Sequence, residues 1–367
     1  MTGNKFFFPE IQPNMFALKH YPEQISGREL DIYLARGWYR MGQTIFTTHF
    51  LCFEKTFYSA IWIRQDLQGY TFRKSLRKIL RKNDRQFEVS YRPALINEER
   101  ERLYQVYRQD FPGVLAPTLL DSLQDGGFSN IFDTYEVSIY DEGKLIGLSY
   151  FDIGENAVAS ITGIYHPDYQ KHSIGFYTML KEIQFCQDRG IRYYYPGYVV
   201  PGYSRFDYKA RIGAVDYYDL RRNDWFAYEK LKKQHIPIHQ MELQLNELAR
   251  LLREAGFAAR IKYYPLFEAN LFGYWHLPYF DYPILLLFRS HPSNKVYDIL
   301  IFDPRTQLFQ LLRCNGIEDF QFYFNEQFLN SFRGPRFFME LINVEQVLLS
   351  SRSAEVMSQS LKKLAAR

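Results

Sequence analysis

Seven basic residues are concentrated in the short segment 71–85, which contains a single acidic residue. The segment carries a net charge of +6, and because the whole chain is at +4, everything else sums to −2. The members of this cationic stripe recur every four residues: Arg73, Lys74, Arg77, Lys78, Arg81, Lys82 and Arg85. On an α-helix they share one half of the surface, where like charges four residues apart repel each other. Such a stripe favours a polyanionic partner, nucleic acid phosphates first and a membrane surface second; a solvated surface helix is the alternative.

A second candidate for binding chemistry is the segment 170–175, Gln170-Lys171-His172-Ser173-Ile174-Gly175, named the donor loop below. It precedes a helix predicted over 173–188, with Ser173 as a plausible N-cap. Backbone N–H groups at such a helix N-terminus bind phosphates. Acyltransferase loops of this kind read Gln/Arg-x-x-Gly-x-Gly/Ala, and here Ser173 replaces the first glycine. The loop alone therefore leaves open a coenzyme A site and an ordinary capped turn.

The elements that must position this loop follow a regular order. The pattern predicts a helix over 99–110, then strands over 135–140, 144–153 and 157–165 separated by turn residues. The donor loop, its helix and a strand over 191–195 come next. This order resembles the core of the GNAT-type acyltransferases. Beyond residue 232 the pattern predicts a helix over 241–255, strands over 284–288 and 296–302, and a last helix over 354–366.

Three stretches of sequence occur in a characteristic order. The first is Gly37-Trp38-Tyr39-Arg40-Met41-Gly42, followed by Phe46 and His49, and the second is Ser75-Leu76-Arg77-Lys78-Ile79-Leu80-Arg81-Lys82-Asn83. The third includes Tyr165-His166-Pro167-Asp168, Ser173-Ile174-Gly175, Tyr195-Pro196-Gly197-Tyr198 and Tyr208-Lys209. Together they resemble the aminoacyl-tRNA–protein transferases, the arginyl and leucyl transferases of the N-degron pathway. The corresponding family patterns are G-[FW]-R-R-x-G…Y-x-x-H, S-x-x-R-R-x-x-K-R-N and F-D-P-D…S-L-G-x-Y…Y-L-G-Y…Y-K, and the resemblance covers residues 30–225.

With this resemblance, the expected fold is α+β with three parts. Residues 1–95 form an N-terminal transferase-family region with the basic helix at 72–83. Residues 96–232 form the GNAT-like acyltransferase core, and residues 233–367 add a C-terminal α+β extension of unknown role.

The cysteines depart from the family pattern. Bacterial members carry a cysteine before a Tyr-Leu pair and a His-Cys…Cys cluster after the first block. Here Asp31-Ile32 precede Tyr33-Leu34, and His49 is followed by Phe50-Leu51-Cys52. The three cysteines, Cys52, Cys186 and Cys314, lie far apart without chelating spacing. The sequence therefore predicts no disulfide framework, no metal centre and no cofactor.

The resemblance implies transfer of arginine or leucine from aminoacyl-tRNA to the N-terminal amine of an acceptor protein. This is aminolysis of an ester, which needs a neutral amine, donors for the oxyanion and a proton for the leaving ribose oxygen. The stripe would hold tRNA phosphates, and the donor loop would face the 3′-terminal adenosine. The second partner is the N-terminal segment of the acceptor, expected to begin with Asp or Glu.

The resemblance also suggests individual roles. Substrate-binding residues are expected in the donor loop and in the aromatic, glycine-containing stretch 194–213: Ser173, Ile174, Gly175, Arg205 and Lys209. Arg205 or Lys209 would pair with the acidic side chain of the acceptor. The expected catalytic residues are Asp168, for the incoming ammonium, Tyr198, for the leaving ribose oxygen, and Tyr208. A helix cap at Asp168 and simple packing of the tyrosines are the structural alternatives.

Composition narrows the class of protein. With 47% apolar and 23% charged residues, the chain is not disordered. The longest aliphatic or aromatic run is 284–288, and no basic-then-apolar leader follows Met1, so we expect a cytoplasmic protein without a membrane partner. Two other functions stay open. The first is an acetyl-CoA-dependent N-acyltransferase, which would explain the core but would give the cationic stripe no role. The second is a non-catalytic tRNA- or N-degron-binding protein, which would be consistent with the absence of the family's cysteines.

Overall fold

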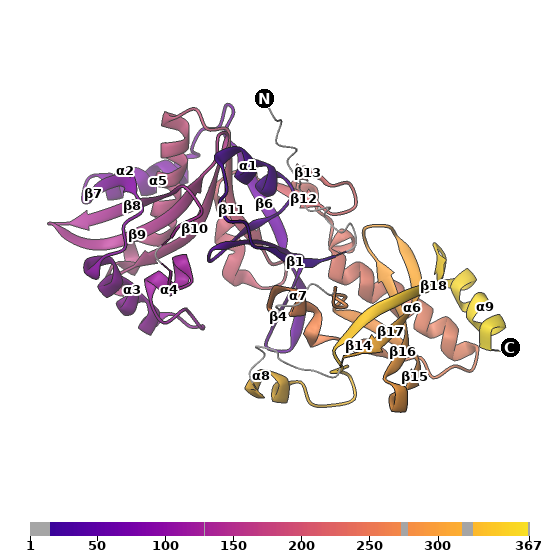
Figure 1. Cartoon of the computed structure of the whole chain (residues 1–367). Coiled ribbons are helices and arrows are strands. Elements are labelled where there is room, and N and C mark those ends of the chain that lie inside the picture. Colours follow the sequence, from indigo (N-terminus) through magenta and orange to yellow (C-terminus); the bar gives the residue numbers. More distant parts are fainter. Residues whose placement is uncertain (1–14, 128, 273–277, 318–325, 366–367) are drawn as a thin grey trace, which may run out of the picture. The chain divides into compact units, whose positions relative to one another are not determined.

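The computed structural model describes residues 15–127, 129–272, 278–317 and 326–365, which fall into two compact units (Figure 1). The core unit comprises residues 19–47 and 60–232. The C-terminal unit comprises the described residues among 1–18, 48–59 and 233–367. This division differs from the expected one, because most of the segment expected as a separate N-terminal region shares a sheet or packs with residues 96–232.

The core unit is built on an eight-stranded sheet. From edge to edge its strands are β13 (Asp224–Ala227), β12 (Asp216–Asp219), β6 (Ile61–Asp66), β11 (Tyr193–Val199), β10 (Ala157–Tyr165), β9 (Lys144–Ile153), β8 (Thr134–Asp141) and β7 (Glu88–Pro93). Neighbouring strands pair in antiparallel fashion, except that β10 and β11 are parallel. The predicted meander β8-β9-β10 is confirmed, and the strand predicted over 191–195 begins two residues later, at Tyr193.

Helices cover both faces of this sheet (Figure 1). On one face lie α2 (Lys74–Asp84) and α5 (Ile174–Asp188), with Tyr177 and Leu180 of α5 packed among apolar side chains of the sheet. On the other face lie α3 (Glu98–Asp110) and α4 (Leu119–Gln124), where Leu103 joins a second cluster with Leu148. The central strands are buried on both sides, and burial of these apolar surfaces is the main contribution to stability.

Shorter elements complete the core unit. Helix α1 (Gly27–Ala35) starts with a capping box, in which the Ser26 hydroxyl accepts from the Glu29 amide and the Glu29 carboxylate accepts from the Ser26 amide. Strands β1 (Ala17–His20), β3 (Thr44–Thr48) and β2 (Tyr39–Met41) form a small sheet in that order, of which residues 17, 18 and 48 belong to the C-terminal unit. Three 3₁₀ segments follow: η1 (Pro167–His172), η2 (Ser204–Ile212) and η3 (Tyr228–Lys230).

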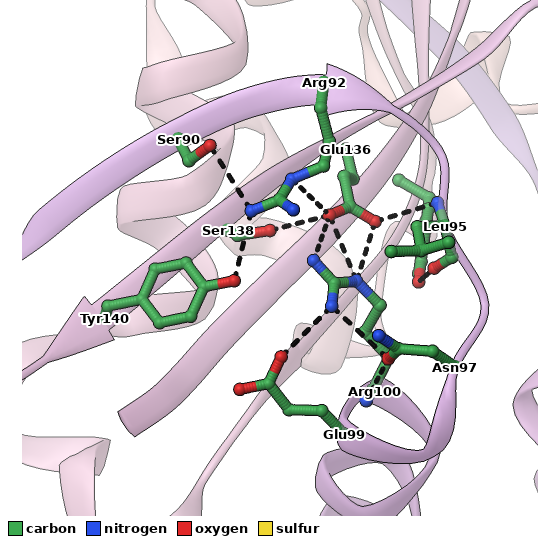
Figure 2. A network of polar contacts seen from close by, with 10 residues as sticks. Ser90, Arg92, Leu95, Asn97, Glu99, Arg100, Glu136, Ser138 and Tyr140 are labelled. Atoms are coloured by element: carbon green, nitrogen blue, oxygen red, sulfur yellow. Dashed lines mark hydrogen bonds and ion pairs between the residues drawn. The ribbon is translucent and has the colours of Figure 1, made fainter. Parts of the chain in front are cut away.

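A buried carboxylate ties α3 to the sheet (Figure 2). Glu136 of β8 is fully buried and accepts from Arg100 Nη2 at 2.6 Å, while Arg92 Nε lies 3.2 Å from the same carboxylate. The amide of Leu95 and the hydroxyl of Ser138 also donate to it. Removing one partner of such a buried pair leaves an uncompensated charge and typically costs about 3–5 kcal/mol. This network is structural and holds the second helical layer in place.

The first sequence block supplies a second buried ion pair. Arg40 lies in β2, and its Nη1 donates to Asp152 Oδ1 at 2.8 Å and to Thr134 Oγ1 at 2.9 Å. Its Nε donates to the Gly42 carbonyl at 2.8 Å, and its Nη2 donates to the Leu123 carbonyl. Because the guanidinium is buried and its donors are used within the protein, Arg40 anchors the block to β8 and β9.

The C-terminal unit contains a five-stranded sheet in the order β14 (Ile261–Tyr263), β15 (Ile284–His291), β16 (Val296–Asp303), β17 (Leu308–Gly316) and β18 (Ile342–Ser351). It also contains the hairpin β4 (Phe50–Phe53) and β5 (Thr56–Ser59). Its helices are α6 (Pro237–Glu254), α7 (Ala269–Phe272), α8 (Glu326–Ser331) and α9 (Ala354–Ala365), with 3₁₀ segments η4 (Lys233–His235), η5 (Pro265–Glu268) and η6 (Pro292–Asn294). The helices and strands predicted here are present, although Ala366 lies outside the described residues. In the described part of the chain, no helix has the length and apolar character needed to cross a bilayer.

Candidate functional site

The sheet of the core unit opens between two of its strands. The parallel pairing of β10 with β11 joins only residues 157–159 to residues 193–195. Both strands continue beyond that point, β10 to Tyr165 and β11 to Val199, without pairing to each other. Irregularities at Ser160–Thr162 in β10 and at Tyr194–Gly197 in β11 accompany the separation. We call this opening the splay; there the facing backbone edges are not paired with each other in a strand ladder.

Tyr39 bridges the two strands at the head of the splay. Its hydroxyl contacts the carbonyl of Ser160 in β10 and the carbonyl of Tyr195 in β11, the latter at 2.8 Å. The ring stacks on Trp62 of β6, with centroids 5.2 Å apart. Burial, with a smaller contribution from the charge of Glu182, raises the pKa of Tyr39 well above 10, so the phenol stays a neutral donor. The sequence suggested no site role for Tyr39, because its two acceptors lie more than 100 residues away.

The donor loop lies where β10 leads into α5. Ser173 occupies the N-cap position of α5, as predicted, but its side chain makes no capping hydrogen bond. The reason is its backbone, which is left-handed at φ 55° and ψ 43°, a conformation that glycine adopts without strain. The amides of Ile174 and Gly175 are the first two of the helix and have no acceptor within it. A methyl group at Gly175 would lie 3.1 Å from the ring of Tyr165, so glycine allows the loop to approach β10 closely.

Asp168 lies in η1, on the surface of the segment that carries the donor loop. Its side chain is 80% exposed, and Oδ2 lies 3.5 Å from Nδ1 of His166. The N-cap of α5 is Ser173, five residues further on, so the alternative role of Asp168 as a cap of that helix finds no support.

The cationic stripe forms the exposed face of α2. Leu76 and Leu80 are buried, while Phe72 and Ile79 pack against the same apolar cluster. All the basic residues are exposed, with Arg73 at the N-cap and the others following it: Lys74, Arg77, Lys78, Arg81, Lys82 and Arg85. The predicted amphipathic helix is confirmed. Within the described residues no carboxylate forms an ion pair with these side chains.

The end of α2 is fixed to the donor loop. Asn83, the last residue of the second sequence block, is fully buried and donates from Nδ2 to the carbonyl of His172 at 3.0 Å. The next residue, Asp84, accepts from Tyr177 and pairs with Lys181 Nζ at 3.0 Å, and both of these belong to α5. The end of α2, which carries the cationic stripe, is therefore bonded to the donor loop and to the first turns of α5, a relationship that the spacing of the motifs does not reveal.

Lys209 of η2 lies close to two aromatic rings, those of Tyr198 and Phe206. Its Nζ is 5.3 Å from the ring centre of Tyr198 and 5.5 Å from that of Phe206. Removal from water lowers the pKa of Lys209 to about 8. Among the described residues no carboxylate pairs with it. Gly197, at φ 96°, allows this approach, because a methyl group there would lie 2.9 Å from Nζ.

The other predicted residues of the stretch 194–213 differ in their surroundings. Arg205 is exposed, but its guanidinium lies 4.5 Å over the ring of Phe111 and donates to the carbonyl of Pro112. Tyr198 packs edge-on against Trp62. Tyr208 as a whole is 40% exposed. Removal of its hydroxyl from water, followed by the charge of Glu182, nevertheless raises its pKa. Of the two residues predicted to pair with an acidic acceptor, Lys209 is the one without a hydrogen bond to the backbone of another segment.

Glu182 is a candidate site residue that the sequence analysis did not single out. It lies on the sheet-facing side of α5, is fully buried, and accepts from the hydroxyl of Tyr194 at 2.6 Å. Burial raises its pKa to about 7. Ile174, Thr178 and Cys186 share its helix face at spacings of four residues. A lone carboxylate on that apolar face was the available signal.

The cysteines lie in settings that make them unreactive. Burial raises the thiol pKa of all three, to about 12 for Cys52 and Cys314, and Cys186 is fully buried. Among residues 15–365, apart from the gaps given above, no three His, Cys, Asp or Glu side chains come together in a metal-binding group.

Comparisons with known proteins agree with the sequence blocks. Residues 72–219 match a family model described as arginine-tRNA-protein transferase, C terminus. The chain is 25% identical over 194 residues to the aspartate/glutamate leucyltransferase of Leptospira interrogans, covering 52% of this chain and 74% of that protein. It is 28% identical over 202 residues to the enzyme of the same name from Campylobacter jejuni, covering 52% and 80%.

Two GCN5-related proteins of known structure match part of the chain at TM-scores below 0.5. A GCN5-related N-acetyltransferase from Kribbella flavida matches with a TM-score of 0.23 and 13% identity, covering 41% of this chain and 61% of that one. A GCN5-related glucosamine N-acetyltransferase region of a fungal multi-domain β-N-acetylglucosaminidase matches with a TM-score of 0.31 and 15% identity, covering 59% and 24%.

Proposed function

Through residues 72–219 the chain belongs to the aminoacyl-tRNA–protein transferase family, and we propose that it transfers arginine or leucine to the N-terminal amine of acceptor proteins that begin with Asp or Glu. The observation that carries this proposal is the link from Asn83 to the donor loop, which joins the cationic stripe to the first turn of α5. A tRNA acceptor stem lying on the stripe would thereby place its 3′ end at the splay. The stripe has no such use in a transferase that takes its acyl group from coenzyme A.

The proposed reaction needs no covalent enzyme intermediate. The acceptor nitrogen attacks the ester carbonyl, a C–N bond forms, the C–O bond to the ribose breaks, and a proton from the amine passes to the ribose oxygen. The amides of Ile174 and Gly175 would bind the terminal phosphate, because a helix N-terminus favours anions. Tyr198 is the proposed donor to the leaving oxygen, and Tyr208 is the other proposed catalytic tyrosine. Asp168 is proposed to attract the incoming ammonium from the surface of the loop.

The ammonium of Lys209 supports the proposal that acceptor proteins begin with Asp or Glu. An ammonium held away from water without an acidic partner is unfavourable, and a carboxylate brought in by the acceptor would stabilise it. Arg205 is the weaker candidate, because its guanidinium is already stacked and hydrogen-bonded.

The test is a transfer assay with radiolabelled aminoacyl-tRNA and peptides that begin with Asp, Glu or Ala. We expect label to enter the Asp and Glu peptides, and little to enter the Ala peptide. Acetyl transfer from acetyl-CoA with no transfer from aminoacyl-tRNA would instead identify an ordinary N-acyltransferase. Tight tRNA binding with neither reaction would identify a non-catalytic binding protein.

A further inference from the structure

The carboxylate of Glu182 lies against both strands that border the splay, near the hydroxyls of Tyr194 in β11 and Ser160 in β10. Its Oε2 accepts from the hydroxyl of Tyr194. Among the described residues, its Oε1 makes no well-formed hydrogen bond, and the hydroxyl of Ser149 makes none either. The hydroxyls of Ser149 and Ser160 lie near enough to favour the ionised form. No described lysine, arginine or histidine forms an ion pair with it.

The five groups whose pKa is raised by the charge of Glu182 are tyrosines and a cysteine, which are neutral near pH 7. They are Tyr194 of β11, Tyr39 of β2, Tyr208 of η2, Tyr91 of β7 and Cys186 of α5. This contrasts with Glu136, the other fully buried glutamate of the core unit, which has two arginine partners. A buried carboxylate without a partner is costly, and a cationic ligand would relieve that cost.

The depth of Glu182 selects among possible ligands. It lies eight residues beyond Ile174 on α5, which corresponds to about 12 Å along the helix at 1.5 Å per residue. An ester held at the first turn of α5 would carry its amino acid toward the splay. A long arginyl or lysyl side chain can bridge this depth together with the side chain of Glu182 itself, whereas a leucyl side chain ends well short and would leave the carboxylate unpaired.

We propose, on the basis of the proposed function, that Glu182 is the specificity-determining residue for the transferred amino acid. Its carboxylate pairs with the guanidinium or ammonium of a basic side chain, so that the donor carries arginine or lysine and not leucine. A site built around a buried polar group rejects a ligand that leaves this group unpaired. In enzymes whose sites hydrogen-bond a polar group of the substrate, the ratio of kcat/KM values between the two ligands reaches about 10⁴.

The experiment compares kcat/KM for Arg-tRNA, Lys-tRNA and Leu-tRNA with an Asp-initiated peptide, in the wild-type chain and in Glu182→Gln. Glutamine keeps the size of the side chain and an oxygen that accepts from Tyr194, so the fold is retained and circular dichroism checks this. Cys186→Ala is the matched control, because it alters the same buried helix face one turn further on without changing charge.

We expect the wild type to favour a basic donor over Leu-tRNA by at least about 100-fold, and Glu182→Gln to remove most of this preference while changing Leu-tRNA use by less than about threefold. Cys186→Ala should change all donors alike. Leu-tRNA used as well as the basic donors by the wild type, or an equal loss for all donors in Glu182→Gln, would overturn the inference and leave the proposed function standing. If the wild type transfers from none of the three donors, the proposed function itself is wrong, and the inference is overturned with it.

Discussion

The hydroxyl of Tyr39 donates to the carbonyl of Tyr195 at 2.8 Å, which brings the first and third sequence blocks together at the head of the splay. The same hydroxyl contacts the carbonyl of Ser160 on the opposite strand. One phenol therefore meets both strands at the point where they stop pairing, and the block that contains it is part of the site's framework.

Replacing Tyr39 with phenylalanine should lower kcat by about tenfold or more without weakening tRNA binding. The change leaves two carbonyls at the splay without this donor, which costs about 1–3 kcal/mol and lets the strands shift relative to the bound ester. Steady-state kinetics and a tRNA binding assay check the two effects. Tyr91→Phe is the control, because it removes a hydroxyl that donates to the carbonyl of Lys181 in α5 and not to a carbonyl of β10 or β11. Equal loss of kcat in both variants would contradict the role given to Tyr39.

Reversing Arg77, Lys78 and Arg81 to glutamate should weaken tRNA affinity and flatten its dependence on salt. For a duplex, each phosphate that the protein no longer neutralises lowers the slope of log K against log salt by about 0.9. Helix content should survive, because Leu76 and Leu80 on the apolar face are unchanged. Binding measured at several salt concentrations tests this expectation.

The control for the stripe makes the same change in net charge on other exposed positions. Arg102 and Arg108 lie on α3, on the other face of the sheet, and Lys144 lies at the start of β9. Their reversal to glutamate should leave most of the affinity and its salt slope intact. Equal loss in the two triple variants would mean that only net charge matters.

Lys209→Ala should raise KM for Asp- and Glu-initiated peptides by about tenfold and leave tRNA affinity unchanged. In the wild type, KM for these peptides should rise as the pH increases through about 8, because the ammonium that pairs with the acceptor loses its proton there. Peptide kinetics between about pH 6.5 and 9 measure both effects. An unchanged KM in the variant would show that another group recognises the acidic residue.

Glu182→Gln should stabilise the fold more at pH 8 than at pH 5. The pKa of Glu182 is raised from 4.5 to about 7 in the folded state, so the native protein binds this proton more tightly than the unfolded chain. The wild type therefore loses stability as the pH rises from about 4.5 through 7, and the variant does not. We expect a difference on the order of 2 kcal/mol between the two pH values, measured by urea unfolding. A difference independent of pH would mean that the carboxyl group has an ordinary pKa.

Local patterns in the sequence predicted the local elements well. Helix α2 and the meander β8-β9-β10 were predictable because their periodicity and turn residues lie within the elements themselves. The insertion of β6 between β11 and β12 was not, because pairing across more than 100 residues leaves no local signature. The extent of the core unit was missed for the same reason.

The candidate site was predictable only in part. The donor loop and Lys209 were proposed from the sequence blocks, but the left-handed backbone of Ser173 was not foreseen, because serine commonly caps helices through its side chain. Glu182 was missed because a carboxylate in the middle of a helix is typical of a surface position until the packing of that face is known.

Mass spectrometry of an Asp-initiated peptide, after incubation with the protein and aminoacyl-tRNA, tests the central claim most directly. The account predicts that the peptide gains the mass of one amino acid residue, attached through a peptide bond to the α-amine of its aspartate. An unmodified peptide, from protein shown to be folded and to bind tRNA, would contradict the claim that this chain is a transferase of that kind.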